Sequence, residues 1–249
     1  MTLSHDVDGD GPAVVFLHAG VCDRRMWDAQ WAALRGAGHR LVRCDFRGFG
    51  GTPAADRPYS DAEDVLSLLD TLGIARAVLV AASYGGHVAL ETAARWPERV
   101  GGLALLCSAV PGHEPSAELT ALGAREEVLL EAGDVAAATE LMVDSWLGPE
   151  ADAAARAAVR TMQRHAFEVQ SAAPEEAEPV EAEVDLTAVR APCLAVSGAH
   201  DFADFRQTAA QLPDAEHLEL PWAGHLPALE RPAAVNELLA DFLARTDTT

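Results

Sequence analysis

The chain has 249 residues, 49 % of them hydrophobic, a size that suits one α/β domain with a small insertion. Its net charge is −21, and every basic residue is arginine. Such acidity argues against a nucleic-acid ligand, which needs a basic surface, and against an anionic membrane. No apolar stretch reaches the length of a membrane span and the N-terminus does not resemble a signal peptide, so we expect a cytoplasmic protein.

Four cysteines, Cys22, Cys44, Cys107 and Cys193, are spread along the chain without a C-x-x-C pair. Disulfides are uncommon in a reducing compartment, so we expect these residues to act as small apolar side chains. No spacing of histidine, cysteine and carboxylate residues matches a metal site. The sequence therefore predicts neither a metal nor a cofactor.

The first hundred residues alternate between short apolar runs and stretches with helical spacing. Buried strands are predicted at 14–17, 41–44, 77–80 and 103–106, and helices at 27–36, 60–72 and from the end of the third strand through Trp96. Ser60 is the predicted N-cap of the second helix, with Glu63 completing a capping box. This alternation predicts an α/β fold with a parallel, doubly wound sheet.

The alternation breaks after residue 110 and resumes at Cys193. Three helices are predicted in between, at 117–131, 135–147 and 151–170, followed by an acidic, proline-bearing stretch from 174 to 185. Strands then return at 193–196 and 218–221, and a last helix is predicted at about 233–245. We therefore expect a core made of residues 1–110 and 191–249, with residues 111–190 as a helical insertion.

Ser83 stands between the apolar run 78–82 and a glycine-containing helical pattern. A nucleophilic serine needs such a strand-to-helix turn, because the tip of the turn carries its Oγ beyond the edge of the sheet. Small residues are required two positions before and after the serine, and these are Ala81 and Gly85. Alanine departs by one methyl group from the glycine of the G-x-S-x-G pattern. The alternative is that Ser83 is a plain helix N-cap.

Two candidate partners follow Ser83 along the chain. Asp201 comes just after the apolar run 193–196 and a glycine turn, and His225 just after the run 218–221. Open parallel sheets place their sites at these C-terminal ends of strands. Serine needs a base to take its proton, which suits the imidazole of His225, and Asp201 is suited to orient that ring.

Other residues compete for the two partner roles. Asp204 follows Asp201 by three residues and lies further from the strand end. His87 lies one helical turn after Ser83, on the helix of the nucleophile itself, where no acid is in reach.

Five segments in this order make the chain resemble the α/β-hydrolase superfamily along nearly its full length: 16–20, 45–50, 81–85, 198–201 and 224–225. The resemblance implies the α/β-hydrolase fold, with residues 111–190 as a small helical cap over the site. The order Ser83, Asp201, His225 is the order of that fold's catalytic triad. The segment Arg25-Met26-Trp27-Asp28 and the short cap resemble the enol-lactonase and small carboxylesterase branch.

Acyl transfer builds an oxyanion, which needs preorganised N–H donors. The backbone of Tyr84, directly after the serine, is one expected donor, and Gly20, in the loop after the first buried strand, is the other. The alternative for Gly20 is a simple strand-ending turn. Val21 and Trp146 are the candidate substrate-binding residues; Trp146 lies in the cap, where packing is the other interpretation.

We therefore predict a serine hydrolase that cleaves a small carboxylic ester or lactone through an acyl-enzyme on Ser83. Two alternatives keep the fold: a C–C bond hydrolase of ring-cleavage products, and a cofactor-free perhydrolase or haloperoxidase. A third, a non-catalytic ligand-binding module, has no need of all three triad members. We expect a monomer or homodimer with a compact, mostly apolar pocket for short acyl groups, and no arginine cluster beyond Arg24-Arg25.

Overall fold

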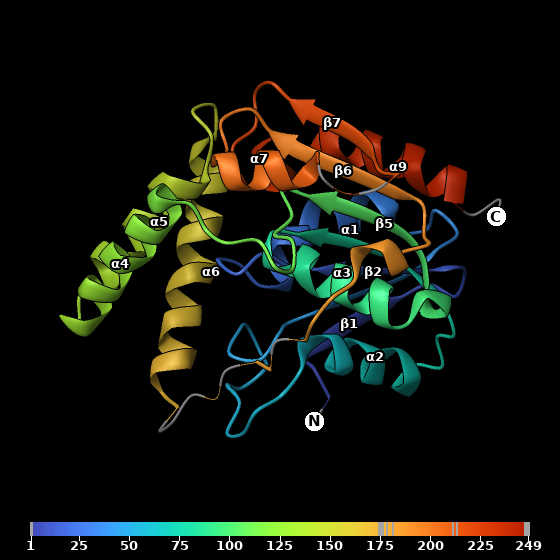
Figure 1. Ribbon diagram of the computed structural model, residues 1–249, viewed down its shortest axis with the longest axis horizontal. Helices are drawn as coiled ribbons and strands as arrows, with labels where there is room; N and C mark the ends of the chain where they lie inside the picture. Colours follow the sequence, from blue (N-terminus) through green and yellow to red (C-terminus); the bar gives the residue numbers. More distant parts are fainter. Residues whose placement is uncertain are drawn as a thin grey trace.

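The computed structural model describes residues 2–173, 177, 179–180, 182–210, 212 and 214–246. One seven-stranded sheet runs through the molecule in the order β1-β3-β2-β4-β5-β6-β7 (Figure 1). The strands are β1 (His5–Asp8), β2 (Ala13–Leu17), β3 (Arg40–Cys44), β4 (Ala77–Ala82), β5 (Val100–Leu106), β6 (Cys193–Gly198) and β7 (Glu216–Leu220). Only the β1–β3 pairing in this sheet is antiparallel. The mostly parallel, doubly wound sheet expected from the sequence is thus confirmed.

Helices cover both faces of the sheet. The four that do so most directly are α1 (Asp28–Leu34) and α9 (Pro232–Thr246) on one face, and α2 (Asp61–Thr71) and α3 (Tyr84–Arg95) on the other. Successive strand side chains point to opposite faces, so β4 supplies both hydrophobic layers. Val78 and Val80 pack with the α1 and α9 residues, whereas Leu79 and Ala81 pack with those of α2 and α3. Both faces of β4 are therefore buried, which explains its unbroken apolar sequence.

Three helices between β5 and β6 extend beyond the arrowheads of the strands (Figure 1). They are α4 (Ala117–Glu131), α5 (Val135–Trp146) and α6 (Ala153–Ser171), and we call them the α4–α6 segment. The remaining short elements are η1 (Arg24–Trp27), η2 (Pro97–Arg99), η3 (Leu186–Ala188), α7 (Ala203–Ala209) and α8 (Pro227–Glu230). Part of the acidic stretch expected from 174 to 185 lies outside the described residues.

The structure contains one strand that the sequence analysis does not predict, and one predicted capping motif is incomplete. The polar start of the chain forms β1, an edge strand whose only hydrophobic residue, Val7, is exposed, so it lacks an apolar pattern. Ser60 does cap α2, since its Oγ accepts the N–H of Glu63 at 3.3 Å. The Glu63 carboxylate, however, pairs with Arg95 at 2.9 Å, and the reciprocal bond of a capping box does not appear among the hydrogen bonds of the described residues.

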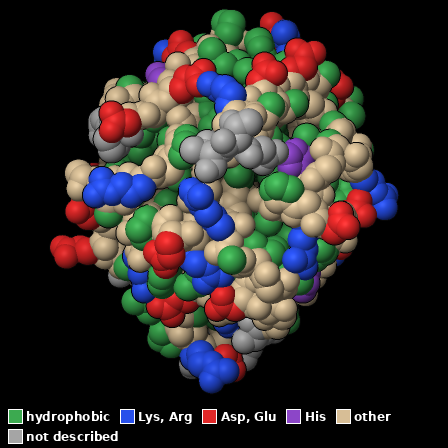
Figure 2. Space-filling view, turned by 90° about the vertical axis from the view of Figure 1, so that its right-hand side faces the viewer, with side chains coloured by type: hydrophobic (Ala, Val, Ile, Leu, Met, Phe, Trp, Pro, Cys, Tyr) green, Lys and Arg blue, Asp and Glu red, His purple; other side chains and the backbone are tan. Residues whose placement is uncertain are grey.

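The surface away from the α4–α6 segment is mixed in character. Figure 2 shows this side, where acidic and arginine side chains are interspersed with apolar ones. In the described part of the chain, no helix has the length and apolar composition needed to cross a membrane.

Candidate active site

Ser83 occupies a strained turn between β4 and α3. Its backbone has φ 50° and ψ −118°, a conformation rare for a side chain other than glycine. Its N–H donates to Leu106 O at 3.0 Å, and its carbonyl accepts from Ala109 N at 3.0 Å, so both sides of the peptide are fixed to the end of β5. A Cβ at Gly85 would lie 2.5 Å from Leu17 O, which explains the glycine required two residues after the serine.

Asp201 and His225 form a buried acid–base pair. Asp201 lies three residues after β6, His225 five after β7, and His225 Nδ1 is 2.8 Å from Asp201 Oδ2. The other carboxylate oxygen accepts the N–H of Phe202 at 2.7 Å. Because a carboxylate accepts, the proton of the neutral imidazole belongs on Nδ1. Nε2 is then a lone-pair acceptor; it is buried and has no partner among the described residues.

The end of β5 connects the Ser83 turn to this pair. Cys107 follows β5 with φ 47°, its N–H donates to Val196 O at 2.7 Å, and its Sγ lies 3.5 Å from Gly224 O. One ligand-type atom each of Cys107, Asp201 and His225 lies within 4.8 Å of the others. Burial, and then the Asp201 charge, raise the pKa of the Cys107 thiol well above its usual range, so it stays protonated. We therefore interpret these three residues as the Asp201–His225 pair with a neutral thiol beside it.

Two aromatic rings pack against the His225 imidazole. Trp146, from α5, lies with its ring 4.4 Å from that of His225, and Phe205, from α7, lies at 4.2 Å. The His225 N–H also donates to Trp146 O at 3.0 Å. A Cβ at Gly224 would lie 2.3 Å from Gly148 N, so only glycine allows the two loops to approach this closely. The α4–α6 segment is therefore in direct contact with the ring and the backbone of His225.

Glu230 fixes the backbone on both sides of His225. Its carboxylate accepts the N–H of Gly224 at 3.0 Å and that of Leu226 at 3.3 Å. Burial raises the pKa of Glu230, and these hydrogen bonds act in the opposite direction. The sequence does not single out Glu230, because an acid in a short helix is typical of a solvated surface.

The candidate oxyanion donors lie next to each other. A Cβ built on Gly20 would be 3.6 Å from Tyr84 Cβ, which brings the loop after β2 against the start of α3. Among the described residues, no backbone hydrogen bond is made by the N–H of Gly20, Val21 or Tyr84. These groups are thus available to an incoming oxygen atom.

His18 braces this loop as a neutral side chain. Its Nε2 accepts the N–H of Phe46 at 3.0 Å, and its Nδ1 donates to Ala19 O at 2.8 Å. Burial lowers the pKa of His18, which favours this neutral form. The His18 carbonyl accepts the N–H of Gly85 at 3.1 Å, so the loop after β2 is bonded directly to the turn that carries Ser83.

The rival residues lie in other contacts. Asp204 accepts from His113 Nε2 at 3.0 Å and from both Ser116 N and Ser116 Oγ at 2.7 Å. Burial alone would raise the pKa of Asp204, but these hydrogen bonds outweigh it and lower that pKa to about 2. The ring of His87 stacks on that of Tyr84 at 6.1 Å. The structure therefore brings Asp201, rather than Asp204, to His225.

A cavity of about 300 Å³ adjoins Gly20 and Tyr84, and its other lining residues include aromatic residues and Asp61. A second cavity, of about 450 Å³, lies against Phe205 and His87. The sequence marked Tyr84 only for its backbone. The contact of its side chain with Asp61 depends on how α2 packs against α3, and no local pattern reports it.

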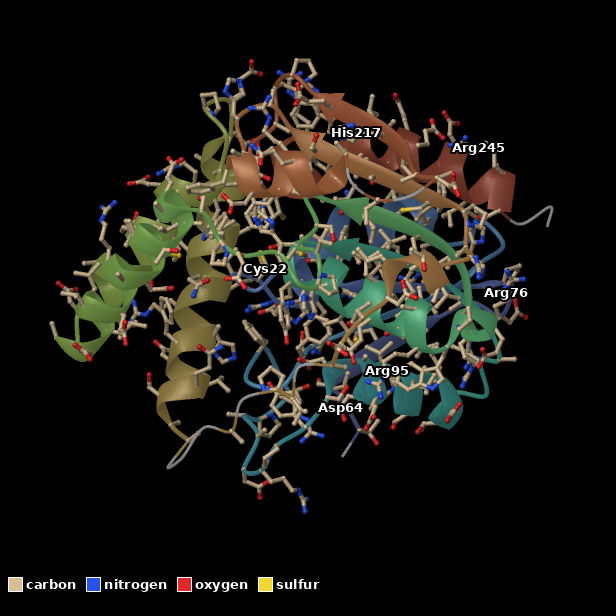
Figure 3. The ribbon with its side chains drawn as sticks, in the orientation of Figure 1. Cys22, Asp64, Arg76, Arg95, His217 and Arg245 are labelled. Atoms are coloured by element: carbon tan, nitrogen blue, oxygen red, sulfur yellow. The ribbon has the colours of Figure 1, made fainter. Side chains whose placement is uncertain are left out.

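The expectation of no arginine cluster beyond Arg24-Arg25 is wrong. A cavity of about 660 Å³ between η1 and α6 is lined by four arginines: Arg24, Arg25, Arg160 and Arg164. Residues so far apart in the sequence meet because α6 packs against η1, on the side where Figure 3 labels Cys22. Each guanidinium pairs with a carboxylate, including Asp23 with Arg25 at 2.5 Å and Glu168 with Arg164 at 3.0 Å. The cluster is therefore charge-compensated.

Known proteins resemble this chain along most of its length. The model of the alpha/beta hydrolase family matches residues 14–238. A putative carbamate hydrolase, RutD, of Variovorax paradoxus (strain S110) is 33 % identical over 268 residues, which cover 98 % of this chain and 97 % of that protein.

Solved structures agree with this relationship. The enol-lactonase from Burkholderia xenovorans LB400 has a TM-score of 0.78 at 27 % identity, covering 97 % of this chain and 96 % of its own. The putative non-heme bromoperoxidase BpoC from Mycobacterium tuberculosis H37Rv has a TM-score of 0.77 at 27 % identity, covering 99 % and 97 %. The chain thus belongs to the alpha/beta hydrolase family and is an enzyme of the hydrolase type built on that fold.

Proposed function

We propose that this protein is a serine hydrolase that cleaves a small carboxylic ester or lactone through an acyl-enzyme on Ser83. The observation that carries the proposal is the His225 imidazole, whose Nδ1 is bonded to buried Asp201 while its Nε2 is buried and has no partner in the part of the chain that the structure describes. A buried acceptor without a donor needs an explanation. A serine hydroxyl provides one, because a histidine base accepts the proton of the serine nucleophile. Ser83 lies at the same edge of the sheet, next to the end of β5.

The chemistry follows from these positions. Ser83 Oγ attacks the carbonyl carbon as its proton passes to His225 Nε2, and Asp201 stabilises the imidazolium that forms. The tetrahedral intermediate collapses, the C–O bond to the leaving group breaks, and His225 returns the proton to that oxygen. A water molecule then attacks the acyl-enzyme by the same route, releasing the carboxylic acid and restoring Ser83.

The oxyanion is assigned to two backbone N–H groups. Tyr84 supplies one at the start of α3, where the helix dipole also favours negative charge. Gly20 supplies the other, with Val21 adjacent to it and facing the substrate. The absence of competing backbone hydrogen bonds at these groups, among the described residues, supports the assignment. His18 holds the loop, so the donors are oriented before the substrate arrives.

Residues 111–190 are proposed to act as a cap that selects the substrate, around a core of 1–110 and 191–249. The support is the contact of Trp146 with the His225 ring and backbone. Each proposed triad member follows a core strand, so the cap contributes shape rather than a proton-transfer group. Short acyl groups suit the cavity of about 300 Å³ beside Gly20 and Tyr84, which is at the small end of ligand pockets.

A substrate panel tests this proposal. Short p-nitrophenyl esters, lactones, an alkyl carbamate, ring-cleavage dienes and a peroxide-dependent halogenation assay are run on wild type and Ser83→Ala. We expect hydrolysis of a short ester or lactone by wild type and its loss in Ser83→Ala. Activity confined to the dienes would identify a C–C bond hydrolase, and activity confined to halogenation a haloperoxidase. Equal activity of wild type and Ser83→Ala would exclude Ser83 as the nucleophile.

A further inference from the structure

Asp61 is a buried carboxyl group next to the proposed oxyanion site. It is the first residue of α2, only 5 % of its surface is exposed, and its Oδ2 accepts the hydroxyl of Tyr84. Its Oδ1 is buried and has no hydrogen-bond partner among the described residues. A buried acceptor without a donor is costly, and in a native structure it calls for a partner such as a ligand or an ordered water molecule.

Asp61 lines the cavity of about 300 Å³ whose other walls include Gly20 and Tyr84. Phe46, Phe49 and Tyr59 give this cavity aromatic walls. A ligand there is surrounded mostly by aromatic rings, and the charged residues of the cavity wall are Asp61 and Arg47. Because the cavity adjoins both proposed oxyanion donors, a group attached to the scissile carbonyl is the part of a substrate best placed to enter it.

The charges around Asp61 favour a hydrogen-bond donor over an anion. Arg47, which also lines the cavity, is engaged by Asp64, with Nε 2.5 Å from Oδ2 and Nη2 2.8 Å from Oδ1. Asp64, labelled in Figure 3, lies three residues after Asp61 on α2. Glu91 adds further negative charge and pairs with Arg95 at 2.6 Å. Asp61 thus lines the cavity without an ion pair among the described residues, and Arg47, whose positive charge acts on it, is held by Asp64.

We propose that this cavity is a subsite for a substrate group that carries an O–H or N–H donor next to the scissile carbonyl, with Asp61 as its acceptor. This inference rests on the proposed function, and it narrows the substrate class to hydroxylated or N–H-bearing small esters and related acyl compounds. Asp61 acts as a specificity residue, whereas Tyr84 fixes the orientation of the carboxyl group through its hydroxyl.

Paired substrates test the subsite on both sides of the scissile bond. The acyl-side pair is p-nitrophenyl butyrate and p-nitrophenyl 3-hydroxybutyrate; the alcohol-side pair is ethyl butyrate and 2-hydroxyethyl butyrate. Wild type is expected to favour the hydroxylated member of at least one pair by about tenfold in kcat/KM, the effect of one hydrogen bond to a charged acceptor. An absence of preference in both pairs would overturn the inference.

Variants then assign that preference to Asp61. Asp61→Asn keeps an acceptor for Tyr84 and turns an amide N–H₂ towards the position of Oδ1, and Asp61→Leu removes both acceptors. Both are expected to bring the ratio within each pair to about one while p-nitrophenyl butyrate is still cleaved. Should Asp61→Leu not fold, Asp61→Asn carries the test. The matched control is Asp70→Asn, on the same helix but 64 % exposed and paired with Arg99, where the ratio is expected to stay at the wild-type value.

The two proposals fail in different ways. If p-nitrophenyl butyrate is cleaved and a fluorophosphonate labels Ser83, but Asp61→Asn retains the hydroxyl preference, the subsite is wrong and the serine hydrolase stands. If wild type neither cleaves the plain ester nor is labelled, the proposed function fails and the subsite fails with it.

Discussion

Two buried carboxyl groups near Ser83 differ in how fully they are bonded. Asp201 has a partner for each oxygen, with His225 Nδ1 on one and the Phe202 N–H on the other. Asp61 has the Tyr84 hydroxyl on one oxygen and, among the described residues, nothing on the other. Burial raises the pKa of Asp61 to about 6. Under the proposed function, the fully bonded carboxylate of Asp201 holds the base in place, while the half-bonded carboxyl group of Asp61 keeps one acceptor oxygen for a ligand.

The largest effect on activity is expected from a substitution of His225, the partner of Asp201. His225→Ala should lower kcat by about 10³-fold or more, because nucleophile and base act as a unit. Steady-state kinetics on a short ester measures the loss. His217→Ala is the control, since His217 lies on β7 and bonds Ser197 at 3.1 Å. A loss below tenfold in His225→Ala would show that another group takes the proton.

The acid of the same region is tested by two aspartates three residues apart. Asp201→Asn should lower kcat by roughly 10²- to 10⁴-fold with the fold retained. The neutral amide cannot stabilise the charge of the imidazolium, and it does not hold the neutral His225 ring in the tautomer with its proton on Nδ1. Asp204→Asn should change kcat little and lower the melting temperature, since Asp204 bonds Ser116 and His113 at the start of the α4–α6 segment. If Asp204→Asn is the more damaging to kcat, the acid is misassigned.

Asp61, the half-bonded carboxyl group, is tested by the pH dependence of the protein's stability. The pKa of Asp61 is raised in the folded protein to about 6, above the unfolded value, so ionisation destabilises the fold progressively as pH rises from about 4 to 6. Asp61→Asn removes this penalty. The free energy of unfolding of Asp61→Asn, minus that of wild type, should therefore increase by roughly 3 kcal/mol between about pH 4 and pH 6. Above about pH 6 this difference should stay constant. Urea unfolding at several pH values measures it, with Asp70→Asn as the control; parallel curves for wild type and Asp61→Asn would contradict the shift.

A smaller effect is expected at the contact between the α4–α6 segment and the base. Trp146→Ala should raise KM and change the preference among acyl chain lengths more than it changes kcat. The reason is that Trp146 packs against the His225 ring but takes no part in the proposed proton transfer. Wild-type activity itself should fall as the acyl chain lengthens from about four carbons to twelve. If Trp146→Ala abolishes reaction of a folded protein with a fluorophosphonate, the segment does more than shape the pocket.

The acid–base region was predictable from sequence and the Asp61 region was not. Ser83, Asp201 and His225 each follow an apolar run. An apolar run that ends in a turn is visible in a few consecutive residues, so such positions can be found from the sequence alone. Asp61 stands in the first turn of an amphipathic helix, where acids are usually solvated. Its burial depends on the packing of α2 against α3, which leaves no trace in spacing.

The same distinction applies elsewhere in the fold. β1 was not predicted because an exposed edge strand needs little apolar sequence. The boundaries of the α4–α6 helices follow from periodicity, and α4 begins and ends at Ala117 and Glu131 as expected. The contact of Trp146 with His225 is a tertiary property, for which the sequence left packing and pocket roles equally open.

The most direct test of the central claim is the identity of the labelled residue. Wild-type protein is treated with a fluorophosphonate probe, digested, and the modified residue is located by mass spectrometry, with Ser83→Ala treated in parallel. The modification is expected on Ser83 alone, with no labelling of Ser83→Ala. Labelling that persists unchanged in Ser83→Ala, or that maps to another residue in wild type, would contradict the assignment of Ser83 as the nucleophile.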